Sequence, residues 1–483
     1  MSDAGKRVLI RTWTVLRETP AIAVLSLFLL LALTVDPFNA PSWHDGQRLL
    51  QLLALLLIAV LGLHAPTTNT DQHMNFSWSW GWMPAGAFAF GLVSVLLSAW
   101  PRWALLEWSM TVALFMAVVI VAAEFRRDPV GSGRYTVVLF YAAGLFYALK
   151  VVLAYVLMFA VGADYGMAFD VQELFPGFSN VRFFGHVQTL LLPFLVLPAL
   201  WWGKSSRQRV LWMLVPVLWW MLVIASGTRG SWVAMAIGAV TVCIFARGTA
   251  IPWLKLQLLG FVAGLLLYLL FVLGLPELLS KPAMYLHRNA DLVSLRGREL
   301  LWGLSADWIA IHPWFGLGPM HFAQRLTEIG AHPHNAVLQW MVEWGVPAAL
   351  LLTAFLAAAG LRFAAWVRNH QSLEVVALLA ALTGAAAQSM VDGVLVMPIS
   401  QLLLVLLAGW AWCLVVPRPD PAATSRSNAF RWFFAAMTAV VMSCVAPEVS
   451  HLQERLEAHE KTYLQGPNPR LLPRFWIHGW IPA

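Results

Sequence analysis

Residues 135–161 read YTVVLFYAAGLFYALKVVLAYVLMFAV and hold a single charged side chain, Lys150. A helix needs about 20 consecutive apolar residues to cross the hydrocarbon core of a bilayer, so this stretch is long enough to span one. In lipid, every backbone polar group must be satisfied within the protein, and a helix does this within its own segment. We interpret Lys150 as a side chain that snorkels to the interface or pairs inside the protein. The stretch therefore predicts a membrane-spanning helix.

The rest of the chain has the same character. Of its 483 residues, 60% are hydrophobic and 11% are charged, whereas a soluble domain carries roughly 25% charged residues. The 26 tryptophans fit a membrane protein, because indole rings favour the interface. We predict an all-α polytopic membrane protein with about twelve transmembrane helices, or thirteen if the last and shortest run also spans. The apolar runs lie at 21–35, 49–64, 84–100, 104–123, 135–161, 185–201, 210–225, 231–246, 253–275, 345–366, 373–391, 398–416 and 430–446.

The positions of the basic residues predict the orientation. With a cytoplasmic N-terminus, the inside segments hold seventeen lysines and arginines and the short outside loops hold four. This asymmetry follows the positive-inside rule. We expect membrane helices over 1–275, a large outside loop over 276–344, further membrane helices over 345–446 and a polar tail over 447–483. The tail lies outside if the run at 430–446 spans, which the basic loop before it favours.

The large outside loop contains a second helical pattern. Residues 296–314 read RGRELLWGLSADWIAIHPW, with apolar residues spaced three or four apart from Leu300 to Ile311. That spacing predicts an amphipathic helix lying on the outer membrane surface. The His312-Pro313 pair is expected to end it.

Four arginines are predicted to lie near the outer interface: Arg182, Arg229, Arg296 and Arg298. An interfacial arginine often only snorkels or pairs with lipid phosphate. Arg229 is more specific, because SGTRGSW at 226–232 predicts a tight turn directly before a helix start, which resembles an anion site. The guanidinium group also offers a bidentate fork to phosphate. These arginines lead us to the hypothesis of a phosphorylated lipid ligand.

The segment AHPHNAV at 331–337 stands before another apolar run. Pro333 restricts His332 to extended backbone, and Asn335 is a good helix N-cap. At the positive end of the helix dipole His334 would be neutral near pH 7, and a neutral imidazole can act as a general base. A capping or interfacial histidine is the alternative. His332 and His334 are expected to point apart and have no clear third ligand, so we predict no metal site.

A polar stripe and two further residues complete the candidates. Asn335, Gln339 and Glu343 fall on one face of the predicted helix. Asp392, in an outside turn, could orient a base, bind sugar or serve only the turn. His186 follows Arg182 by one helical turn and could share its ligand. No nucleotide-binding fingerprint stands in a convincing setting, so no cofactor is expected.

Three motifs together resemble one family. They are HPHNAVLQWMVEWGVPAALL at 332–351, GRELLWGLSADWIAIHPWFGLGPMHF at 297–322 and SGTRGSW. They resemble signatures of bacterial O-antigen ligases, their polymerase relatives and protein O-oligosaccharyltransferases. The resemblance covers about 175–400.

The resemblance implies a membrane fold of the glycosyltransferase C type in the bacterial inner membrane, with its active site facing the periplasm. It implies a donor glycan on undecaprenyl diphosphate and a metal-independent transfer that inverts the anomeric configuration. His334 matches the family's essential histidine, Arg229 and Arg298 match arginines needed for activity, and Arg182 matches a further one. Alongside Arg182, the candidate substrate contacts are Arg296, His332, His186, Asn335 and Asp392.

Among members of this family, we favour a ligase that transfers O-antigen to lipid A-core. A protein O-oligosaccharyltransferase stays open because of the polar tail after 446, and a polymerase stays open as well. A lipid-linked glycan transporter is the alternative from another class. It would predict inverted repeats and spans broken at mid-membrane, and neither is found in the sequence.

Overall fold

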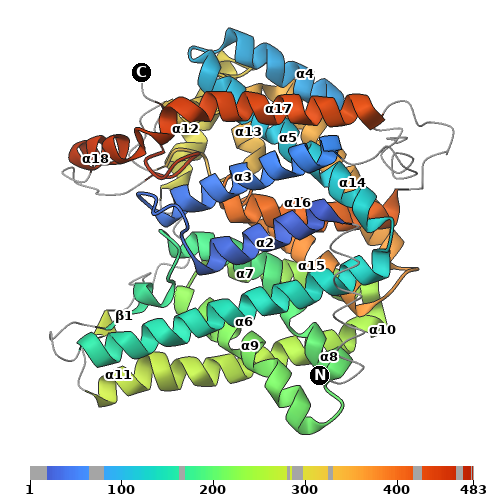
Figure 1. Ribbon diagram of the computed structural model, residues 1–483, viewed down its shortest axis with the longest axis vertical. Coiled ribbons are helices and arrows are strands. Elements are labelled where there is room, and N and C mark those ends of the chain that lie inside the picture. Colours follow the sequence, from blue (N-terminus) through green and yellow to red (C-terminus); the bar gives the residue numbers. More distant parts are fainter. Residues whose placement is uncertain are drawn as a thin grey trace.

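The computed structural model describes residues 19–64, 81–162, 169–279, 283–284, 297–324, 330–416, 427–463, 472–479 and 481. Within these ranges the chain is almost entirely helical (Figure 1). Apart from connecting loops, the only other secondary structure in these ranges is a parallel pair of two-residue strands, β1 (Phe169–Asp170) and β2 (Ala283–Met284). The predicted all-α fold class is confirmed at this level.

Every predicted apolar run lies in a helix. The first seven runs correspond to α2 (Pro20–Thr34), α3 (Trp43–His64), α4 (Trp82–Leu97), α5 (Pro101–Phe125), α6 (Pro129–Gly162), α7 (Val181–Leu195) with α8 (Leu197–Trp202), and α9 (Ser206–Ser226). The remaining runs correspond to α10 (Arg229–Leu267), which continues through η3 (Tyr268–Gly274) and α11 (Leu275–Leu278), and to α14 (Val346–Val367), α15 (Leu373–Gln388), α16 (Pro398–Val415) and α17 (Ser427–Val449).

Among the described residues, nine helices are long and apolar enough to cross a membrane. One of them, Arg229–Leu278, is broken at Arg247, where φ is 44° and ψ is −124°, and so holds two predicted runs. Three shorter apolar helices, α2, α4 and α15, account for three more runs. The multi-pass helical architecture is therefore confirmed, while the number of twelve or thirteen crossings stays a prediction.

Close approach between helices depends on small residues, as is usual in lipid. A Cβ atom on Gly238 of α10 would lie 2.7 Å from the carbonyl oxygen of Ala380 on α15. Phe125 and Trp410 stack between α5 and α16 with ring centroids 5.5 Å apart.

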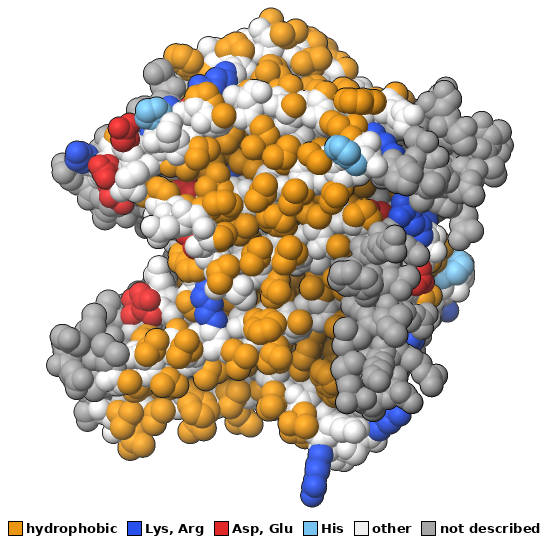
Figure 2. Space-filling model, in the orientation of Figure 1, with side chains coloured by type: hydrophobic (Ala, Val, Ile, Leu, Met, Phe, Trp, Pro, Cys, Tyr) orange, Lys and Arg blue, Asp and Glu red, His pale blue; other side chains and the backbone are white. Residues whose placement is uncertain are grey.

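The surface of the molecule is largely apolar. Apolar side chains such as Leu153 are exposed, and apolar side chains dominate the face in Figure 2. Such a surface is expected where the solvent is a lipid chain.

Several helices begin at one end of the bundle, which we call the site end: α7, α10 and α16. Gly185 of α7 lies against Ser231 of α10, since a Cβ on Gly185 would be 2.5 Å from the serine oxygen. In Figure 2 the left edge of the molecule is hollowed between the part that carries α18 (Leu452–Tyr463) and the part that carries α11 and β1.

The predicted amphipathic helix is observed as α12 (Arg298–Ile311), and His312 is its C-cap. Its position on the outer membrane surface stays a prediction. Only part of its apolar stripe faces lipid or water: Ile311 is 68% exposed, whereas Leu301 is buried. Leu301 packs with Phe322 of η4 (His321–Gln324) and with Val342 of α13 (Ala336–Trp344). The stripe therefore joins α12 to the segment that precedes α14.

α13 is a separate short helix, although the sequence pattern suggested a polar stripe running into the following span. Gly345, with φ 88° and ψ 161°, ends this helix before α14 begins. A Cβ there would collide with the carbonyl group of Trp314. The N–H of Val346 donates to the carbonyl of Pro313 at 2.8 Å, which fixes the corner.

The thirteenth run is the helix α17, which returns the chain to the site end. There Glu448 pairs with Arg102 at the start of α5. The part of the tail that was predicted to be helical is α18. Elsewhere, the short helix η2 (Val171–Leu174) lies in the loop before α7. Residues 472–479 are not helical, as expected, but 474–479 are buried rather than solvated, with Trp476 only 1% exposed.

Candidate functional site

Asp392 lies at the centre of the site, in the loop between α15 and α16. Its Oδ2 atom is 3.4 Å from Nε2 of His186 on α7, and its Oδ1 atom is 3.7 Å from Nδ1 of His334. Asp392 is 7% exposed and His186 is fully buried. The carboxylate therefore lies between two imidazoles that come from distant parts of the chain.

The loop before α13 directs His334 toward Asp392. His334 has φ 55°, a left-handed conformation that is uncommon for a side chain other than glycine. The backbone N–H of His334 donates to Nδ1 of His332 at 3.2 Å, and the centroids of the two rings lie 4.2 Å apart. The prediction that these histidines point apart is wrong, because the left-handed residue turns the chain and brings the rings into contact.

Hydrogen bonds hold this loop against the loop of Asp392. Asn335 is the N-cap of α13 and accepts from the N–H of Leu338, as predicted. Its amide nitrogen also donates to the carbonyl of Met390 at 3.1 Å. The side-chain oxygen and nitrogen of Asn335, a candidate substrate contact, both bond within the protein, which fits a structural role.

His332 is buried behind His334 and is closely packed. A Cβ atom on Gly393 would lie 2.7 Å from Cε1 of its ring, so only glycine fits there. Across the loop, Trp302 of α12 donates its indole N–H to the carbonyl of Pro333 at 3.0 Å. This bond gives a physical reason for the tryptophan four residues after Arg298.

The electrostatic setting favours a neutral His334. Burial lowers the pKa of His334, the nearby Asp392 opposes this, and the positive charges of Arg182 and Arg298 lower the pKa again. The predicted direction is thus correct, but burial is the main cause, not the helix dipole. Burial also lowers the pKa of His332 well below its usual value. For Asp392, burial raises the pKa, but His186 and His334 outweigh it and hold the pKa well below its usual range.

The predicted arginines lie in the first turns of three helices. Arg182 is the second residue of α7, Arg229 the first of α10 and Arg298 the first of α12. Arg182 and Arg298 lie close enough to His334 to affect its charge. Arg229 is next to Gly230, whose Cβ would lie 3.8 Å from Oδ2 of Asp392. The structure therefore brings all three toward one region, as the sequence analysis expected.

This placement works against local helix stability. A cation near a helix N-terminus faces the positive end of the dipole, and the unfavourable effect is roughly 0.3–1 kcal/mol per residue at an exposed end. Three arginines placed this way around one loop each destabilise the start of their own helix, although the fold keeps them there. Conflicts of this kind are expected at functional sites. An anion bound between these helix ends would relieve the conflict, because it would interact favourably with the dipoles and the guanidinium groups.

A small polar network fixes the start of α10. The hydroxyl of Thr228 donates to Ser231 at 3.0 Å, and Gln388 of α15 donates to the same serine at 3.1 Å. Gly227, with φ 56°, allows the tight turn that the sequence predicted. Arg229 is thus held by a rigid turn rather than by a flexible loop.

Arg296, the remaining arginine candidate, lies outside the described residues. In the described part of the chain, no group of three or more His, Cys, Asp and Glu side chains has an arrangement that could hold a metal ion.

One buried charge cluster was missed by the sequence analysis. Arg474 lies between Glu107 of α5 and Glu343 of α13, and all three side chains are mostly or fully buried. Glu343 belongs to the predicted polar stripe, but its partner was not foreseen. The only sequence signal was the aromatic content of PRFWIHGW at 473–480, which is unusual for a solvated tail.

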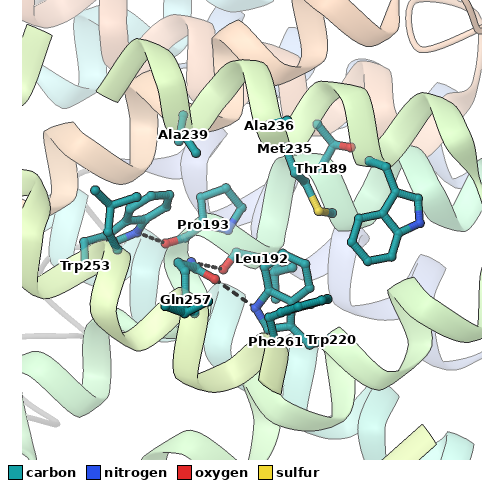
Figure 3. Close-up of a pocket in the computed structure, with 14 residues that line it drawn as sticks. Thr189, Leu192, Pro193, Trp220, Met235, Ala236, Ala239, Trp253, Gln257 and Phe261 are labelled. Atoms are coloured by element: carbon teal, nitrogen blue, oxygen red, sulfur yellow. Dashed lines mark hydrogen bonds between the residues drawn. The ribbon is translucent and has the colours of Figure 1, made fainter. Parts of the chain in front are cut away.

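An apolar cavity of about 480 Å³ lies beside the site between α7, α9, α10 and α15 (Figure 3). Its walls are almost entirely apolar, with Trp220, Trp253 and Phe261 pointing inward from α9 and α10. The side chain of Gln257 accepts a hydrogen bond from the indole N–H of Trp220 and donates one to the carbonyl of Leu192. Thr189 on the wall is one helical turn beyond His186, so the cavity begins close to the site.

These features define a multi-pass helical membrane protein with histidine, aspartate and arginine side chains gathered at one end of its helices. Residues 213–353 match the family model described as O-antigen ligase, so this part of the chain carries that family's domain. The resemblance drawn from the motifs is thereby confirmed. The matched segment contains Arg229, Arg298 and His334, and the family consists of glycosyltransferase-like ligases and polymerases. No curated protein matches the chain.

Proposed function

We propose that this protein is an inverting glycosyltransferase that moves an O-antigen glycan from undecaprenyl diphosphate to a sugar hydroxyl of lipid A-core. The reaction would take place at the periplasmic face of the inner membrane. The observation that carries the proposal is the set of arginines in the first turns of α7, α10 and α12, beside the His334–Asp392 pair.

The arginines would bind the diphosphate. Guanidinium groups and helix N-termini both favour phosphate oxygens. As the bond between the anomeric carbon and the diphosphate oxygen breaks, its electron pair leaves with undecaprenyl diphosphate. Preorganised cations stabilise that growing charge more than they stabilise the ground state, and this lowers the barrier.

His334 would activate the acceptor. The acceptor hydroxyl oxygen attacks the anomeric carbon, and its proton passes to Nε2 of His334. Asp392, within 4 Å of Nδ1, would orient the ring and stabilise the imidazolium that forms. A single displacement of this kind inverts the anomeric configuration.

The apolar cavity in Figure 3 supports a lipid-linked donor. Its walls are formed by α7, α10 and α15, which also form the site, and they lie deeper along the same helices. Isoprenoid units near the diphosphate would therefore find an apolar lining that begins one helical turn beyond Arg229 and two turns beyond Arg182. A soluble nucleotide sugar has no need of such a cavity.

The test combines a null strain with reconstitution. Loss of the lipopolysaccharide ladder with retained lipid A-core, restored by the wild-type gene, is the expected result. In nanodiscs, the purified protein with lipid-linked glycan and lipid A-core should form the ladder at equal rates with and without EDTA. An intact ladder with loss of pilin glycosylation would instead select the protein O-oligosaccharyltransferase, and ligated single repeat units would select the polymerase. Strong inhibition by EDTA would overturn the metal-independent mechanism.

A further inference from the structure

The segment 472–479 inserts a charge into the interior of the site end. Arg474 is 1% exposed, and its Nη2 atom donates to Glu343 at 2.7 and 3.0 Å. The same guanidinium binds Glu107 through Nη2 and, at 3.3 Å, through Nε. One guanidinium therefore joins α5, α13 and a segment that lies far beyond both in the chain.

The backbone around Arg474 is fixed by α3. The carbonyl of Phe475 accepts from Nε of Arg48 at 3.1 Å. Two residues later, the N–H of Ile477 donates to Asp45 at 2.8 Å. A loop held this way on both sides of a buried cation is a built element of the fold and not a loosely adsorbed tail.

The segment also lies beside the histidine loop. A Cβ atom on Gly479 would lie 3.4 Å from Cβ of Ala331, the residue before His332. From the other side, Glu343 lies in the last turn of α13, the helix that Asn335 caps. Arg474 is close enough for its charge to contribute to the lowered pKa of His332. Residues 472–479 thus lie against the start of the His334 loop and against the far end of α13, the helix that follows it.

We propose that residues 472–479 form a clasp that positions His334, with Arg474 as a positioning residue that acts through Glu343 and α13. This inference rests on the proposed function and names a residue outside the matched family domain. Arg474 itself touches neither donor nor acceptor in this account. Arginine is needed because a planar fork can serve two carboxylates at once, whereas lysine presents a single point charge.

Two variants disturb the clasp by different physical means. Arg474→Lys keeps the positive charge but removes the fork. Gly479→Ala leaves every charge in place, but its Cβ would collide with the carbonyl of Leu472 at a residue with φ 70°. Lys461→Gln, on the exposed face of α18, is the matched control. If one clasp variant does not fold, the other still tests the proposal.

The experiment measures transfer kinetics in nanodiscs together with hydrogen–deuterium exchange of residues 330–338. Both clasp variants should lower kcat by about 10- to 100-fold, because a misplaced catalytic group costs rate even when binding is intact. The KM for the lipid-linked donor should stay within about threefold, and exchange in 330–338 should rise. Wild-type kcat in a folded clasp variant would overturn the proposal. So would a loss of kcat without any change in exchange.

The proposed function and the clasp can be rejected independently of each other. A fully active His334→Ala variant would overturn the assignment of His334 as the base, whatever Arg474 does. An inactive His334→Ala variant combined with a fully active Arg474→Lys variant would overturn only the clasp.

Discussion

Nδ1 of His334 lies 3.7 Å from Oδ1 of Asp392, although the two residues precede different helices, α13 and α16. This relationship assigns different roles to the two nitrogens of the imidazole. Nδ1 faces the carboxylate, so Nε2 is the nitrogen that would take a proton from an acceptor. Since Asp392 also faces His186, its position is held from both sides.

Replacement of His334 by alanine should abolish transfer while leaving the fold and donor binding intact. General-base catalysis contributes about 10²- to 10⁴-fold, and a loss of this size in kcat is expected. The measurement is the rate of ladder formation in nanodiscs, with donor affinity determined separately. His312→Ala is the matched control, because His312 is exposed at the end of α12. Normal product from His334→Ala would reject the base role.

The pH dependence of transfer should reflect the lowered pKa of His334. The neutral ring is the active form, so the rate should stay constant from neutral pH down through the usual histidine range and fall only at lower pH. Arg182→Gln removes a charge that lowers the pKa of His334, so its acid limb should move to higher pH. Asp392→Asn removes the group that raises that pKa, so its acid limb should move to lower pH while kcat falls. Profiles of kcat for the three proteins check both directions, and shifts of the opposite sign would contradict this assignment.

Arg298→Lys should fail although it keeps the charge. Lysine lacks the bidentate fork, and removal of one preorganised donor from a charged transition state costs about 10²- to 10³-fold in kcat. Arg207→Lys, which is exposed at the opposite end of the bundle, is the control. Full activity of Arg298→Lys would make Arg298 a lipid anchor rather than a phosphate ligand.

The apolar cavity should matter for the lipid part of the donor only. Ala239→Phe places a ring in the cavity, whereas Ile237→Phe on the same helix does not line it and is 42% exposed. We expect Ala239→Phe to raise KM about tenfold for a long polyprenyl donor, since lost apolar burial is worth about 25 cal/mol per Å². A donor with a short lipid chain should be unaffected. Equal KM values for both variants with the long donor would show that the chain binds elsewhere.

Much of the architecture was predictable because it depends on local composition. An apolar run has to become a helix in lipid whatever its neighbours are, so each predicted run is a helix in the structure. The Asn335 cap and the end of α12 at His312 were also predictable, since side-chain capping and a following proline act within a few residues. The arginines of α7, α10 and α12 could be singled out because their polarity is unusual in this chain.

The sequence by itself therefore determined the helices, their order and the kinds of side chain at the site. Only the tertiary structure decided that Asp392 lies between His186 and His334, that the rings of His332 and His334 touch, and that Arg474 enters between Glu107 and Glu343. Helix formation is governed by short-range backbone bonding and side-chain hydropathy, which a sequence displays directly. Contacts between distant segments depend on how the helices pack, and small residues such as Gly185 and Gly393 allow that packing without any local signal of which partner they will meet.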